Sequence, residues 1–148
     1  MFAYEIWEPE TADLIYELEK IQNSFLRFLS FKINNPMKFD NHNYIPILRH
    51  FNMLSLKQSR IYHNFILLFK SFNNHINAPE IINLFNFYVP NRKVRQCPKI
   101  FFIPKNYIFI GDSSIVFKLS LLANNNYNWF ELFHPSISYI KRTIKNNI

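Results

Sequence analysis

A run of basic and aromatic side chains between residues 92 and 107 is the part of the sequence best suited to binding a polyanion. From Arg92 to Lys105 the chain contains no acidic residue. Its cations can neutralise phosphate groups, and exposed aromatic rings between them can stack on unpaired bases, worth about 1–3 kcal/mol per base. The candidate nucleic-acid-binding residues are Arg92, Lys93, Arg95, Lys99 and Lys105.

The apolar residues of the same region also fit the interior of a folded domain. In that interpretation they are core residues, and the surrounding charge is a solvated basic surface without a ligand. The sequence leaves both interpretations open. The residues concerned are Ile100, Phe101, Ile103, Phe109 and Ile110.

The other reactive side chains form no known catalytic or metal-binding pattern. No two of the five histidines are four residues apart, and the single cysteine, Cys97, excludes an intramolecular disulfide. Only four acidic residues follow residue 20, and no two are adjacent, whereas two-metal polymerase chemistry needs clustered carboxylates. With one glycine, a glycine-rich phosphate loop is impossible, and turns that need positive φ must use asparagine. We expect no catalytic residue, metal, cofactor or small-molecule substrate.

The net charge of +7 is distributed unevenly along the chain. Residues 1–20 hold six acidic side chains against one lysine, a balance of −5. The remaining residues hold 16 basic and 4 acidic side chains, a balance of +12. A field of this sign attracts polyanions, so RNA or DNA, bound weakly and electrostatically, is the expected partner.

Apolar spacing predicts a helix over residues 9–31. Its apolar residues form one stripe along the helix, and Pro9 suits the first helical position. Further on, Ser55 and Gln58 form a capping-box pattern, and Ser136 can cap a last helix. The stripe consists of Leu14, Leu18, Ile21, Phe25 and Leu29.

Helical spacing fails after Asn86, where β-type compositions follow. Residues 99–103 and 107–110 are separated by Pro104-Lys105-Asn106, which predicts a short β-hairpin. Residues 111–113 should end the hairpin and cap the next helix. The expected fold is mainly α, with about five helices in a small bundle-like domain and one short β-hairpin. No repeat or linker divides the chain, so residues 1–148 are expected to form a single domain.

The sequence carries no signal-peptide pattern at its acidic N-terminus and no apolar run of about 18 residues. An intracellular protein of the cytoplasm or nucleus, without a membrane partner, is therefore expected.

Four stretches, in this order, resemble the region that follows the polymerase in non-LTR retrotransposon reverse transcriptases of the jockey type. The first is Trp7-Glu8-Pro9 followed by a helix similar to "I..LE..Q..F.RF" over residues 15–28. The second, residues 51–60, is similar to "L.LLSL..RR" but lacks the second arginine, and "LYK" and "P.LL" elements follow at residues 67–70 and 79–84. The third is Phe87-Tyr88-Val89-Pro90 with Arg92 and Arg95. The fourth is Asp112-Ser113-Ser114-Ile115 with Leu122 and Asn124-Asn125.

The resemblance implies a non-catalytic segment of an RNA-directed DNA polymerase. The Tyr/Phe-x-Asp-Asp metal motif of the polymerase palm is not present in this sequence. The implied partners are template RNA or target DNA and the missing polymerase domain of the parent protein. The alternative is a decayed or truncated retroelement fragment that acts only as a structural scaffold.

Overall fold

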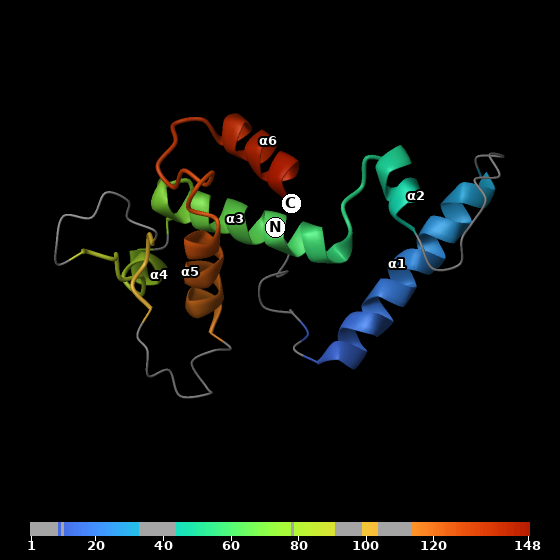
Figure 1. Ribbon diagram of the computed structural model, residues 1–148, viewed down its shortest axis with the longest axis horizontal. Helices are drawn as coiled ribbons and strands as arrows, with labels where there is room; N and C mark the ends of the chain where they lie inside the picture. The colour runs from blue at the N-terminus through green and yellow to red at the C-terminus, as the bar shows by residue number, and fades with distance from the viewer. Residues whose placement is uncertain (1–8, 10, 33–43, 78, 91–98, 104–113) are drawn as a thin grey trace. The chain divides into compact units, whose positions relative to one another are not determined.

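The computed structural model describes residues 9, 11–32, 44–77, 79–90, 99–103 and 114–148 (Figure 1). Within these residues the fold is mainly helical, as predicted, with six helices rather than about five. The chain divides into two compact units, Met1–Arg60 and Ile61–Ile148, with the boundary inside the third helix. The helices are α1 (Ala12–Lys32), α2 (Ile45–His50), α3 (Leu56–Phe72), α4 (Pro79–Ile82), α5 (Ile115–Asn125) and α6 (Ile137–Asn147).

In the first unit, α1 packs against α2. Leu26 on α1 is fully buried, and Ile47 on α2 is almost so. Arg27 Nη2 donates a hydrogen bond of 3.1 Å to Tyr44 Oη, just before α2. Apolar burial and one polar contact thus join the two helices.

The predicted apolar stripe of α1 does not face this unit's interior. Leu14, Leu18, Ile21 and Phe25 are between 39% and 66% exposed, and the buried residues of α1 are Leu26 and Ser30. Spacing identifies which residues share a helix face. It does not decide which face meets the neighbouring helix, because that depends on partners distant in sequence.

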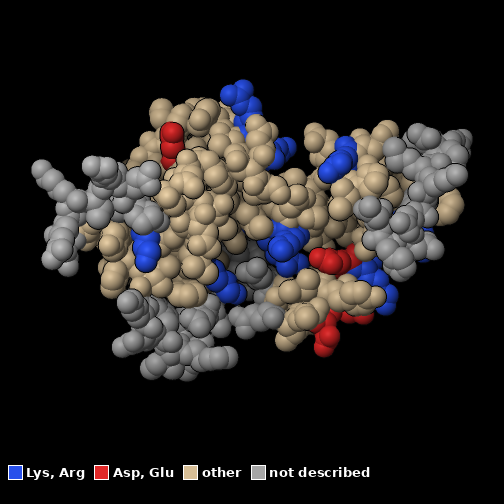
Figure 2. Space-filling view, viewed as in Figure 1, with Lys and Arg blue, Asp and Glu red and all other residues tan. Residues whose placement is uncertain are grey.

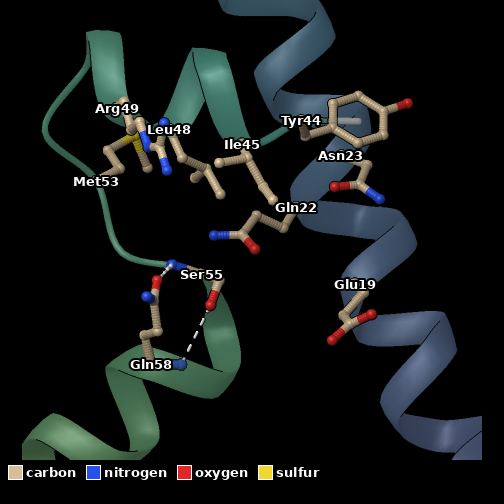
Figure 3. A pocket seen from close by; sticks show the side chains of 10 residues that line it. All are labelled: Glu19, Gln22, Asn23, Tyr44, Ile45, Leu48, Arg49, Met53, Ser55 and Gln58. Atoms are coloured by element: carbon tan, nitrogen blue, oxygen red, sulfur yellow. Dashed lines mark hydrogen bonds between the residues drawn. The ribbon is translucent and has the colours of Figure 1, made fainter. Parts of the chain in front are cut away.

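The capping box at the start of α3 is confirmed (Figure 3). Gln58 N donates to Ser55 Oγ, and Ser55 N donates to Gln58 Oε1, each at 3.2 Å. Gln22 of α1 adds two bonds: its Nε2 donates to Leu54 O at 3.2 Å, and its Oε1 accepts from Leu56 N at 3.3 Å. The side-chain amide of Gln22 therefore holds the entry to α3 on both sides of Ser55.

The second unit has an aromatic core to which α3, α5 and α6 contribute. Phe65 of α3 is fully buried, with ring centroids 5.0 Å from Trp129 and 4.7 Å from Phe130. Tilted rings at these separations add about 0.5–1.5 kcal/mol per pair to the hydrophobic gain. Figure 1 shows α5 and α6 on either side of α3 in this view. The fully buried large side chains here are Phe65, Phe69, Phe101, Leu68, Leu119, Ile140 and Ile144.

Local signals locate most turns and caps. Ser136 caps α6 by accepting from Tyr139 N, as predicted. α5 is capped by Ser114, one residue after the predicted segment, because its Oγ accepts from Phe117 N. Asn52 (φ 51°) and Asn74 (φ 56°) are the positive-φ residues of the described chain, which fits the expectation that asparagine replaces glycine in turns.

The predicted β-hairpin is not seen. Phe101 pairs instead with Phe87 through an isolated antiparallel bridge, flanked by Tyr88 N to Ile100 O at 3.0 Å and Phe102 N to Asn86 O at 2.7 Å. The predicted second arm, residues 107–110, lies outside the described residues.

A side chain from α5 takes the hydrogen-bonding edge of residues 100–101. Asn124 Oδ1 accepts from Ile100 N at 2.8 Å and from Phe101 N at 2.9 Å, and Asn124 Nδ2 donates to Phe101 O at 2.9 Å. On the edge away from Phe87, one amide thus satisfies backbone groups that a second neighbouring strand would otherwise bind.

Substituting Asn124 should destabilise the second unit. Asn124→Ala should lower the free energy of unfolding by about 2–4 kcal/mol, because each partly buried backbone group left without a partner costs about 1–3 kcal/mol. Urea denaturation followed by circular dichroism measures this. Asn125→Ala, at the exposed neighbouring position, is the matched control and should change stability by less than about 0.5 kcal/mol. Equal denaturation midpoints for the two variants would contradict the structural role of Asn124.

Candidate nucleic-acid interface

Of the five predicted nucleic-acid-binding residues, the structure describes Lys99, which is exposed. Arg92, Lys93, Arg95 and Lys105 lie outside the described residues. The chain leaves the described part at Pro90 and returns to it at Lys99. The structure therefore defines the two segments that flank the first part of the basic run, residues 86–90 and 99–103.

The structure separates the aromatic and aliphatic residues of this region into core and surface. Phe101 is fully buried, and Ile100 and Ile103 are partly buried, in agreement with the core interpretation. Phe102 is 51% exposed, because successive side chains of an extended segment point to opposite sides. Phe109 and Ile110 lie outside the described residues.

An aromatic cluster around Phe87 connects the core with the exposed surface. The Phe87 ring lies 5.3 Å from Phe101, 5.6 Å from Phe72 and 6.3 Å from Phe133, and it stacks on the last of these at 28°. Phe87 is 47% exposed and Phe133 is 63% exposed. Phe87 and Phe133 were not among the sequence candidates, since composition does not show which rings reach the surface.

The flanking segments form an open groove, which we call the aromatic groove. Its lining residues are Phe87, Tyr88, Val89 and Phe102, and its volume is about 360 Å³. Among these four side chains, the Tyr88 hydroxyl is the one hydrogen-bonding group. These four side chains thus offer aromatic and apolar contact to a ligand, and one hydroxyl that could form a hydrogen bond with it.

The whole net charge of the chain belongs to the second unit. Ile61–Ile148 contains ten Lys and Arg against three Asp and Glu, a balance of +7, whereas Met1–Arg60 contains seven of each. On the face that Figure 2 views, basic side chains stand singly or in small groups among mostly uncharged residues, with acidic side chains beside some of them. On α6, Lys141, Arg142 and Lys145 are exposed while Ile140 and Ile144 are buried, as expected for a solvated helix face.

A larger hollow in the first unit, of about 590 Å³, lies between α1, α2 and the start of α3 (Figure 3). Its charged lining residues among those described are Glu19 and Arg49, which carry opposite charges, so it concentrates no charge of one sign. The side chains of Gln22 and Gln58 already bond to backbone groups. This hollow is therefore a weaker candidate for a phosphate-bearing ligand than the second unit.

Other kinds of site have little support in the described chain. In the part that the structure describes, no three His, Cys, Asp or Glu side chains gather where they could hold a metal ion. No helix within the described ranges is long and apolar enough to cross a membrane.

Burial raises the pKa of the Tyr62 phenol, which favours its neutral form. The stability this contributes is present at neutral pH and is lost only as the pH rises above the ordinary range of tyrosine, about 10.

Comparison with known proteins yields no match: no family model, curated protein or solved structure is significantly similar to this chain. Function is therefore inferred from the residues themselves.

The purified chain should not extend a primer on an RNA template in the presence of magnesium. The reason is the absence from the sequence of adjacent carboxylates able to hold two metal ions. Incorporation of labelled nucleotide, compared with a buffer control and an active reverse transcriptase, measures this. Template-dependent incorporation above the buffer control would show the expectation to be wrong.

Proposed function

We propose that this chain is a non-catalytic accessory segment of a mobile-element RNA-directed DNA polymerase, where it contacts template RNA or target DNA. The observation that carries the proposal is the charge of Ile61–Ile148, ten basic against three acidic side chains, with the acid-free run from Arg92 to Lys105 inside it. The four sequence stretches that resemble the post-polymerase region of jockey-type elements support the proposal that the parent protein is a polymerase of this kind.

Electrostatic contact is the mechanism of binding in this proposal. Cations of the basic run neutralise phosphates and release condensed counterions, which makes the affinity fall steeply with salt. Phosphate contacts carry no base information, so they hold RNA and DNA alike and leave sequence choice to other parts of the parent protein. The chain thereby holds the polynucleotide while the polymerase domain, its second partner, performs the chemistry.

A scaffold role is the second candidate, and the surface of α1 favours it. Leu14, Ile21 and Phe28 are each more than half exposed on that helix. Exposed apolar groups gathered on one element mark surfaces that pack against another protein. In this alternative, the chain is a decayed or truncated retroelement fragment whose apolar face packed on the polymerase, and nucleic acid is not its ligand.

The salt dependence of binding separates the two candidates. If Arg92, Lys93, Arg95, Lys99 and Lys105 each meet a phosphate, the log–log slope of affinity against salt should be about −3 to −4, at about −0.7 per contact for single strands. Changing Arg92, Lys93 and Arg95 together to Ala should flatten the slope by about two units. Fluorescence anisotropy with a labelled single strand across a salt series measures both slopes.

The matched control changes Lys141, Arg142 and Lys145 on α6 to Ala, which removes the same charge from a solvated face. This variant should keep the slope of the unmodified chain. No binding at low salt, or the same slope in both triple variants, would leave the scaffold role as the better account.

A further inference from the structure

Three of the residues that line the aromatic groove have exposed apolar side chains. Val89 is 78% exposed, and Phe87 and Phe102 are each about half exposed. The three share one groove with the half-buried Tyr88. Apolar surface held together in this way favours a ligand that covers it. The open shape of the groove and its ring-bearing walls suit a flat, aromatic ligand.

We propose that the aromatic groove receives the unpaired bases of a single-stranded nucleic acid, with a base stacked on the ring of Phe102. This inference rests on the proposed function and deepens it by naming the form of nucleic acid and the contact. Every base has a π face, so such stacking requires no particular sequence.

Charge complementarity selects this ligand over an uncharged one. Lys99 is exposed and precedes Phe102 by three residues, so its Cα lies within about 11 Å of that of Phe102. The unit that carries the groove has a balance of +7. A ligand whose flat rings alternate with negative charges matches both the groove and its surroundings.

The groove is held in shape before any ligand binds. Phe102 N donates to Asn86 O at 2.7 Å and Tyr88 N donates to Ile100 O at 3.0 Å, which fixes the two walls against each other. Behind them, Phe87 packs on the buried Phe101 ring, and Asn124 anchors residues 100–101. Little conformational entropy is lost when a base enters a preorganised site.

The lining also predicts what the groove discriminates. Its four described lining residues carry no charged side chain and a single hydroxyl, so these side chains offer little hydrogen-bonded reading of base edges. In a duplex the bases are paired and stacked on each other, and their faces are not available. The groove should therefore bind single strands more tightly than duplexes, and base-bearing strands more tightly than abasic ones. Its affinity should not depend on the base sequence.

An abasic strand provides the decisive comparison. The full chain is titrated, at one fixed salt concentration, with a labelled thymidine oligonucleotide, with an abasic strand of the same number of phosphates, and with a duplex of the same length. The base-bearing single strand should bind most tightly. Phe102→Ala should weaken its binding by at least about fivefold, and leave the abasic strand and the salt slope unchanged.

Two further substitutions distinguish stacking from simple apolar contact. Phe102→Trp should retain the affinity of the unmodified chain, whereas Phe102→Leu, which keeps apolar volume without a ring, should behave like Phe102→Ala. Phe28→Ala removes a similarly exposed ring, 56% exposed, from α1 in the first unit and should change nothing. Circular dichroism with urea denaturation checks that each variant folds like the unmodified chain.

The outcomes separate this inference from the proposed function. If Phe102→Ala binds the base-bearing strand as tightly as the unmodified chain does, with the salt slope intact, the groove is not the site and electrostatic binding stands. Equal affinity for base-bearing and abasic strands, or preference for the duplex, also overturns the inference alone. Absence of binding to all three ligands at low salt overturns both.

Discussion

The side-chain amide of Asn124 fills the hydrogen-bonding edge of residues 100–101, where a neighbouring strand would otherwise bind. Because the backbone is held there, the Phe101 ring enters the core and the next side chain, Phe102, must point the other way. The position of the opposite segment, residues 86–88, depends on this, since Phe87 pairs with Phe101 and its ring joins the aromatic cluster. Core, surface ring and groove thus depend on one amide whose loss would release all three.

Gln22 performs a comparable role in the first unit, where its amide bonds backbone groups on either side of Ser55. Gln22 and Asn124 thus play similar parts in their two units. In this structure each bonds to backbone atoms distant in sequence, so these positions have a structural role. The rings of Phe87 and Phe102, by contrast, are about half exposed at the surface of the described chain.

The elements that the sequence predicted well are those determined locally. The reciprocal bonds of Ser55 and Gln58 and the cap at Ser136 involve residues three apart, so spacing alone was sufficient. The spacing in α1 identified an apolar stripe but not the buried face: Leu26 is fully buried, and α1 packs against α2, which lies about twenty residues further on. The pairing of Phe101 could not be predicted for a similar reason: within the described residues its partner is Phe87, and a side chain from α5 completes its bonding. For the candidate site, composition indicated the cations, but only the pairing of the two arms shows which rings are exposed.

The adjacency of Phe101 and Phe102 has a consequence for chain length. In an extended segment, a slip of one residue exchanges the inner and outer side chains. A slip that carried Phe102 into the position of Phe101 would bring Ile103, which has no ring, to the position of Phe102. A slip in the opposite direction would bring Ile100 to the core position and Phe101 to the groove. Because Asn124 binds backbone atoms, which are the same at every position, the side chains and not this amide select the register. Natural variants that lengthen or shorten the basic run should therefore keep the register of residues 100–102 and place the change in length outside this segment.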